Sequence, residues 1–180
     1  MGSRNRRRRS ANTDAAADSG SGPTERVCAE VRTVYSRLAG RAPQRSCESR
    51  TDCCRFRLTG RTPYLTRGEA LVAAHAVRAT GRRSLPEASG GECPLLDAAG
   101  RCLIYEDRPF ACRSHFCSAA GGTYPRALVA DLIAELDAMD DRLGGSGGVS
   151  LPSAVARALT ELDRERRENR RPGPRARTRR

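Results

Sequence analysis

The sequence is poor in the large side chains that usually fill a protein core. It contains no Trp, and aromatic residues make up only 4% of its 180 residues. It also contains no Lys, so its basic residues are Arg and two His. A small domain with so few large apolar side chains is helped considerably by a metal cross-link. The length allows one domain with tails, or at most two small domains.

Membrane, secretion and enzyme signals are also missing. No apolar run approaches the ~20 residues that a membrane-spanning helix needs. The basic N-terminal stretch is followed by no hydrophobic segment, so it lacks the pattern of a secretion signal. We therefore expect a cytoplasmic protein with no membrane partner. The chain has no HExxH, phosphate loop, nucleophile elbow or CxxC redox pair. No catalytic residue or organic cofactor is assigned, and an enzyme is not expected.

The net charge of +12 is confined to the two ends of the chain. Residues 1–10 contain five Arg and no acidic residue, residues 164–180 contain nine Arg and two Glu, and residues 11–163 are neutral. Basic tails of this kind bind nucleic acid or acidic lipid by counterion release, or they are solvated extensions. No aromatic residues lie between these arginines to stack on bases. We therefore favour solvated extensions.

Composition and periodicity divide the chain into three segments. Residues 1–23 are expected to be a disordered basic tail, residues 24–163 a cysteine-cluster domain, and residues 164–180 a second basic tail. The domain is predicted to be mainly α, with helices around an irregular, cysteine-rich centre. Helical spacing and end signals predict helices at 24–40, 66–81 and 125–143 and from Pro152 onward. Short strands are expected at 55–58 and 102–105, and residues 144–148 are expected to be a flexible break.

Seven of the eight cysteines fall into two groups, and this is the feature with clear chemistry. Clustered cysteines in a reducing compartment more often hold a metal than form disulfides. A structural zinc ion takes four such ligands in a tetrahedron, and an iron–sulfur cluster also usually takes four thiolates. Seven cysteines exceed four, so there are two sites or some cysteines are spare. The groups are Cys47, Cys53 and Cys54, then Cys93, Cys102, Cys112 and Cys117.

The residues around the cysteines are more specific than the spacing. The chain has CPLL at 93–96, GRCLIY at 100–105, RPFACR at 108–113 and a last cysteine at Cys117. These segments resemble the YkgJ-type cysteine-cluster family, which is described as a zinc- or iron-chelating domain. The Cys53–Cys54 pair and Glu69 at a helix start are similar too. The resemblance covers about residues 47–117, and it implies the metal ligands Cys47, Cys53, Cys54, Cys93, Cys102, Cys112 and Cys117.

The first cysteine motif departs from the family pattern, which is usually C-x2-C-x2-C-C. Cys47 matches the first cysteine, but Arg50 stands at the second. Arginine stays protonated and cannot coordinate a metal, so one family ligand is missing. His115, between Cys112 and Cys117, is a candidate replacement, because imidazole is a common ligand. The alternative is a surface or hydrogen-bonded histidine, which we favour from sequence alone.

Other residues near the cysteines have simpler interpretations. Cys28 lies outside the family region, near a helical apolar stripe, and is expected to be a buried small hydrophobe. His75 is expected to be a packed or capping histidine. Arg108 and Arg113 flank the second cysteine group, where they shape a turn and form an ion pair, or stabilise thiolates by their positive charge.

Three functions are compatible with these features. The first is a metal-binding protein that holds zinc or iron in a structural or storage role. The second is an iron–sulfur protein for electron transfer or redox sensing. The third is a zinc-stabilised nucleic-acid-binding module that uses the Arg-rich tails. A metal ion is the expected partner, and the sequence names no protein partner and no oligomeric state.

Overall fold

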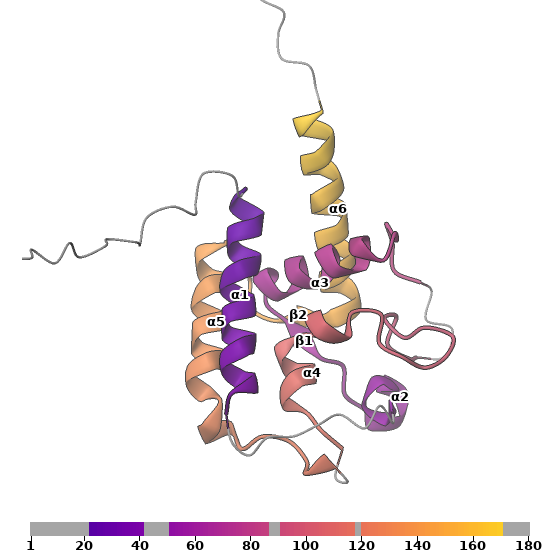
Figure 1. Cartoon of the computed structure of the whole chain (residues 1–180), viewed down its shortest axis with the longest axis vertical. Helices are drawn as coiled ribbons and strands as arrows, with labels where there is room; N and C mark the ends of the chain where they lie inside the picture. The colour runs from indigo at the N-terminus through magenta and orange to yellow at the C-terminus, as the bar shows by residue number, and fades with distance from the viewer. Residues whose placement is uncertain (1–21, 42–50, 87–90, 118–119, 171–180) are drawn as a thin grey trace, which may run out of the picture.

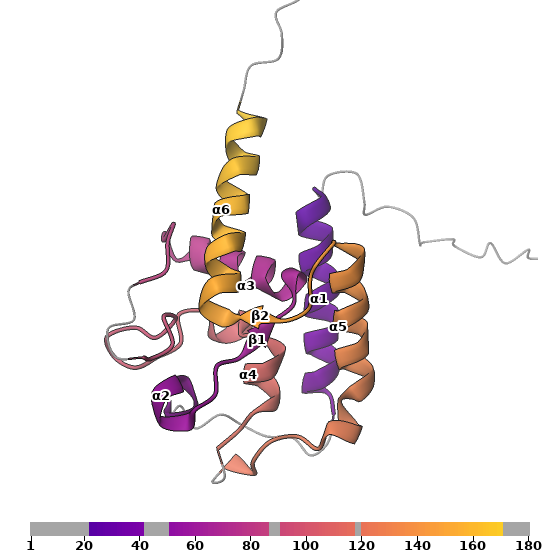
Figure 2. The same cartoon turned by 180° about the vertical axis from the view of Figure 1, so that it is seen from behind.

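A computed structural model describes residues 22–41, 51–86, 91–117 and 120–170. The prediction of a mainly α fold around an irregular cysteine-rich centre is confirmed. Figures 1 and 2 show α1 and α5 side by side, α3 crossing toward α6, α4 between α1 and α2, and α2 on the flank away from α5. None of the described helices is both long and apolar enough to cross a membrane. Most of the two predicted basic tails lies outside the described residues.

Helix α1 (Pro23–Ala39) begins and ends where the sequence predicts. Pro23 suits the first helical position because its missing N–H would have no helical partner. Val31, Val34 and Leu38 are buried on one face, and Gly40 follows the last turn. Cys28 is also buried, as expected for a small hydrophobe on this helix.

Helix α3 (Arg67–Ala79) is the central helix of the core and packs against both α1 and α6. The predicted capping box is present: the Thr66 hydroxyl accepts from the Glu69 N–H, and the Glu69 carboxylate accepts from the Thr66 N–H. Small residues permit close contact with α1. A Cβ at Gly68 would lie only 3.0 Å from Val31 Cγ2.

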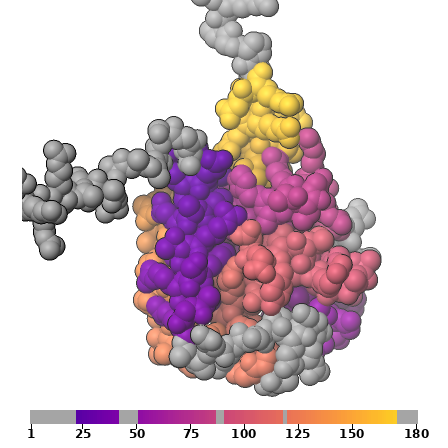
Figure 3. Space-filling model, viewed as in Figure 1, coloured from indigo at the N-terminus to yellow at the C-terminus, as the bar shows by residue number. Residues whose placement is uncertain are grey.

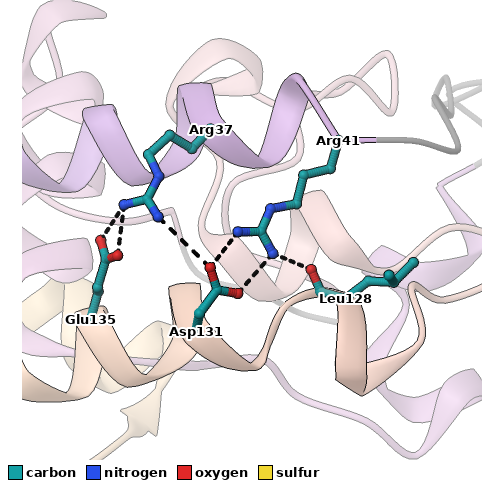
Figure 4. A network of polar contacts seen from close by, with 5 residues as sticks. All are labelled: Arg37, Arg41, Leu128, Asp131 and Glu135. Atoms are coloured by element: carbon teal, nitrogen blue, oxygen red, sulfur yellow. Dashed lines mark hydrogen bonds and ion pairs between the residues drawn. The ribbon is translucent and has the colours of Figure 1, made fainter.

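Helix α5 (Ala130–Arg142) lies along α1 and buries Leu132 and Leu136. It starts later than predicted, because Arg126–Leu128 form a 3-10 turn instead. Figure 4 shows the polar contacts between the two helices. Arg37 binds Glu135 at 2.6 Å, and Arg41 binds Asp131 at 2.8 Å and the Leu128 carbonyl. These arginines and carboxylates are exposed or partly exposed.

A two-residue antiparallel pair joins distant parts of the chain. Strand β1 (Tyr64–Leu65) pairs with β2 (Val149–Ser150), with Tyr64 opposite Ser150. Helix α6 (Leu151–Asn169) follows directly and packs on α3 through residues up to Leu162. Its last turns stand out from the body in Figure 3. The predicted domain end at 163 therefore falls within α6.

Both predicted short strands are wrong. Residues 55–58 alternate like a strand, but Phe56–Thr59 form the one-turn helix α2, which ends at Gly60 with φ +63°. Leu58 is 73% exposed, so the alternation has no buried face to pair. In residues 102–105 only Cys102 forms a bridge, opposite Leu96. A 3-10 turn over Tyr105–Asp107 follows instead.

Candidate metal centre

Four of the predicted metal-ligating cysteines border one cavity of about 510 Å³. Cys53 and Cys54 come from a 3-10 turn, Cys102 from its bridge with Leu96, and Cys112 from the short helix α4 (Phe110–Ser114). These segments are far apart in the sequence. The fold therefore brings both cysteine groups to the same place, as the predicted centre requires. The other lining residues are Thr51, Leu96, Asp97, Gly100, Arg101, Leu103, Tyr105, Arg108 and His115.

The Cys53–Cys54 pair is presented by a tight turn. Thr51 adopts a left-handed backbone with φ +58°, and the Cys54 N–H donates to the Thr51 carbonyl at 2.8 Å. The two Sγ atoms lie 3.8 Å apart. A tetrahedral ion with zinc–sulfur bonds of about 2.3 Å has sulfur–sulfur edges of about 3.8 Å. The pair is therefore spaced as two ligands of one such ion.

The second cysteine group is attached to the first by its backbone. The Cys93 N–H donates to the Cys54 carbonyl at 2.7 Å, and Cys93 is buried. From there the chain turns back at Asp97, whose carboxylate accepts from the N–H groups of Ala99 and Arg101. This turn carries Cys102 to the cavity. Hydrogen bonds that need no metal thus set the path between Cys93 and Cys102.

Cys112 is positioned from the core by Glu69. The Glu69 carboxylate is buried and accepts from the Phe110 N–H at 2.8 Å, at the start of α4. It also accepts from the Tyr35 hydroxyl at 3.3 Å and from Thr66. Burial raises the pKa of Glu69 above its ordinary value. One acidic side chain therefore ties α1, α3 and the helix that carries Cys112 to one another.

The thiols of Cys93, which does not line the cavity, and of the cavity cysteines resist carrying negative charge together. Burial raises the pKa of Cys93 to about 12, and burial with the neighbouring thiols raises the pKa of Cys112 well above its ordinary value. The pKa of Cys54 is also raised, mainly by its hydrogen bond with Cys53. That hydrogen bond lowers the pKa of Cys53. A bound cation would favour the thiolate form of all of them.

The two arginines near the cluster have different surroundings. Arg108 lines the cavity and stacks on the Tyr105 ring at 4.1 Å. The pKa of Cys53 is lowered mainly by its hydrogen bond with Cys54, and the positive charge of Arg108 lowers it further. Arg113 donates to the carbonyls of Arg108 and Glu106 and lies over the Tyr35 ring. The charge-stabilising interpretation therefore suits Arg108, and Arg113 braces the backbone of the turn.

The remaining candidate ligands differ in whether they line this cavity. Cys117 is not among the residues that line this cavity, and its carbonyl accepts from the Ala120 and Gly122 N–H groups. Cys47 and Arg50 lie outside the described residues. His115 does line the cavity with the cysteines, which sequence reasoning alone did not favour. His75 lies on α3, partly buried.

The donor set fits a soft metal by its chemistry. None of the seven cysteines in the described residues forms a disulfide. Within that same part of the chain, no three Cys, His, Asp or Glu side chains converge closely enough to hold an ion. Coordination therefore requires the thiols around the cavity to turn inward beside Cys53 and Cys54.

Comparison with known families supports this assignment. Residues 45–130 match the model of the CxxCxxCC family, described as "Putative zinc- or iron-chelating domain". This segment of the chain is similar to the CxxCxxCC family. This family is the YkgJ-type family that the cysteine motifs resemble, and the match supports metal binding. The matched segment spans all seven clustered cysteines and excludes Cys28. No curated protein and no solved structure matches the chain.

Proposed function

We propose that the CxxCxxCC domain binds one zinc or iron ion through thiolates drawn from five cysteines. The observation that carries this proposal is the 3.8 Å spacing of the Cys53 and Cys54 sulfurs at a cavity that two further cysteines border. It matches the sulfur–sulfur edge of a tetrahedral site with bonds of about 2.3 Å. The five candidates are Cys53, Cys54, Cys93, Cys102 and Cys112.

The proposed role of the metal is to cross-link the domain. Ligands from residues 53–54, 93–102 and 112 belong to three segments with little regular structure of their own. A metal that joins them adds its binding free energy to the free energy of folding. This suits a chain with no Trp and 4% aromatic residues.

An iron–sulfur cluster is the second candidate. The observation in its favour is the size of the cavity, about 510 Å³, which exceeds the space of a single ion. Such clusters also take cysteine thiolates, usually four. Electron transfer or redox sensing would follow from this candidate. Nucleic-acid binding stays a prediction from the Arg-rich tails, because residues 1–21 and 171–180 lie outside the described residues.

Metal analysis with an absorption spectrum tests the proposal. The full chain is purified without oxygen, and its zinc, iron and acid-labile sulfide are counted per chain. A single zinc ion gives a colourless protein, whereas a cluster gives broad visible absorption that bleaches on reduction. Protein that binds neither zinc nor iron under reducing conditions would contradict the proposal.

Cysteine substitutions test the assigned ligands. Replacing Cys53 and Cys54 together by Ser keeps the side-chain size but removes two thiolates, so most of the bound metal is expected to be lost. The matched control is Cys28→Ala, which removes a thiol from the α1 core. Unchanged metal content in the double variant, or loss of metal in the control alone, would show that the ligands lie elsewhere.

A further inference from the structure

His115 lines two cavities of the cysteine cluster. It lines the cavity of about 510 Å³ with Cys53 and Cys112. The same three side chains also line a smaller cavity of about 160 Å³. One imidazole and two thiols therefore border both cavities, and they would have to turn toward one another to share an ion. His115 also follows α4 directly, so the Glu69 contact that positions Cys112 holds its backbone as well.

One ring nitrogen of His115 already has a partner. Nδ1 lies 3.1 Å from the Thr123 hydroxyl oxygen. If Nδ1–H donates to that oxygen, the proton is on Nδ1 and Nε2 keeps its lone pair. Metal-binding histidines usually donate their second N–H to an oxygen in this way, which fixes both the ring orientation and the tautomer. In that tautomer, Nε2 is the ring nitrogen that can donate its lone pair to a metal.

The charge of the site favours a nitrogen donor among its ligands. The CxxCxxCC pattern has a cysteine where this chain has Arg50, so the first motif supplies one thiolate fewer. Three thiolates and one neutral imidazole form an established zinc ligand set. With a divalent ion, this set carries one negative charge, whereas four thiolates carry two. The imidazole thereby lowers the charge that the partly buried site must hold.

We propose that His115 is a metal ligand of this domain through Nε2, with Cys53 and Cys112 as neighbouring ligands. This inference rests on the proposed metal-binding function. It adds a nitrogen donor that the cysteine motifs do not contain, and it gives Thr123 the role of a positioning residue.

The composition of the chain permits a clean test. His75 and His115 are its only histidines, so any imidazole signal from bound metal arises from one of the two. The full chain, made without a histidine tag, is loaded with zinc and measured by X-ray absorption. The wild type is expected to show imidazole scattering, His115→Ala to lose it, and His75→Ala to keep it. Zinc affinity is expected to fall at least about tenfold in His115→Ala.

Each other outcome has a definite meaning. If the wild type binds zinc with sulfur scattering alone, His115 is not a ligand, while the proposed metal-binding function survives. This measurement needs no variant, so it holds even if His115→Ala does not fold. An imidazole signal that persists in His115→Ala and disappears in His75→Ala would also overturn the inference. A wild type that binds no zinc and no iron refutes the proposed function itself.

Discussion

Glu69 is the residue on which both the core and the cysteine cluster depend. Its carboxylate accepts from the Thr66 N–H at 3.0 Å and from the Phe110 N–H at 2.8 Å. Both donors lie in a region without access to water, so they have no ready replacement partner. The sequence predicts the cap on Thr66 from the spacing of the two residues. The contact with Phe110 joins residues 41 positions apart and has no local signal.

We expect Glu69→Ala to lower the free energy of unfolding by about 2–5 kcal/mol, because two or more buried donors lose their acceptor at about 1–3 kcal/mol each. Glu69→Gln keeps one acceptor oxygen and should cost less. Urea denaturation of the metal-free protein measures both. Equal stability of the wild type and Glu69→Ala would mean that these donors find other partners. Arg57→Ala, an exposed site on α2, serves as the control and should stay within about 0.5 kcal/mol.

At the scale of elements, Asp140 connects α5 to the start of α3 and to a loop that the sequence marks only as glycine-rich. It is buried, and its carboxylate accepts from the Arg67 N–H at 2.6 Å and the Gly147 N–H at 3.0 Å. The loop folds tightly over it, since a Cβ at Gly145 would lie 2.2 Å from this carboxylate. Residues predicted to be a flexible break thus help to hold β2 in place.

Asp140→Ala is expected to lower the free energy of unfolding by about 1–3 kcal/mol, because it removes the acceptor of these two N–H groups. The matched control is Asp141→Ala, one position along the same helix, where the side chain is exposed and the effect should be within about 0.5 kcal/mol. Denaturation midpoints of the two variants compare them directly. An equal effect at both positions would contradict the role given to Asp140.

The pairing of α1 with α5 should depend weakly on pH. The hydrogen bond from Arg41 lowers the pKa of Asp131 to about 2, below the value of about 3.9 in an unfolded chain. A lowered pKa in the folded state stabilises the protein above pH ~4, and this stabilisation is lost as pH falls toward 2. Asp131→Asn should therefore lose less stability over that window. Urea denaturation midpoints of both proteins are measured at pH 5 and at pH 2.5. An equal fall of the midpoint in the wild type and in Asp131→Asn would refute the prediction.

The sequence predicts elements where local signals and burial agree, and it fails where distant contacts decide. Helix α3 follows from its capping box and apolar face, and α1 follows from its stripe and Gly40. Residues 55–58 alternate, but no strand lies beside them, so they coil into α2. The pair β1–β2 joins residues 64–65 to 149–150, a contact that no local pattern indicates. The order of the cysteines along the chain predicts the cysteine cluster. The contact between His115 and Thr123 exists only once the turn between them has folded, so the sequence does not predict it.

At the scale of the whole molecule, the basic ends are predicted to be separable from the domain. The charge pattern places the net charge outside the cysteine-bearing segments, and neither end has an apolar face to bury. A chain of residues 22–170 is therefore expected to keep the helical content and metal load of the full chain. Circular dichroism and metal analysis check this. Loss of soluble, metal-loaded protein on truncation would show that the ends belong to the domain.

Metal and fold should be coupled in this molecule. The cavity gathers ligands from three chain segments, and the raised pKa values of Cys93 and Cys112 indicate that their thiolates are costly without a cation. Metal that binds only the folded chain stabilises it by mass action, by about 2.7 kcal/mol when free metal is at 100 times its dissociation constant. Removing metal with a chelator should therefore lower the melting temperature, and adding zinc should restore it.

The control for this coupling is the Cys53→Ser/Cys54→Ser double variant, which keeps the fold contacts of the backbone but lacks the paired sulfurs. Its melting temperature should lie near that of the metal-free wild type and should not respond to zinc or to the chelator. If the melting temperature of the wild type is the same with and without metal, metal binding is not coupled to folding. In that case the hydrogen bonds from the Cys93 N–H to the Cys54 carbonyl and from the Phe110 N–H to the Glu69 carboxylate would be enough to hold the centre without its ion.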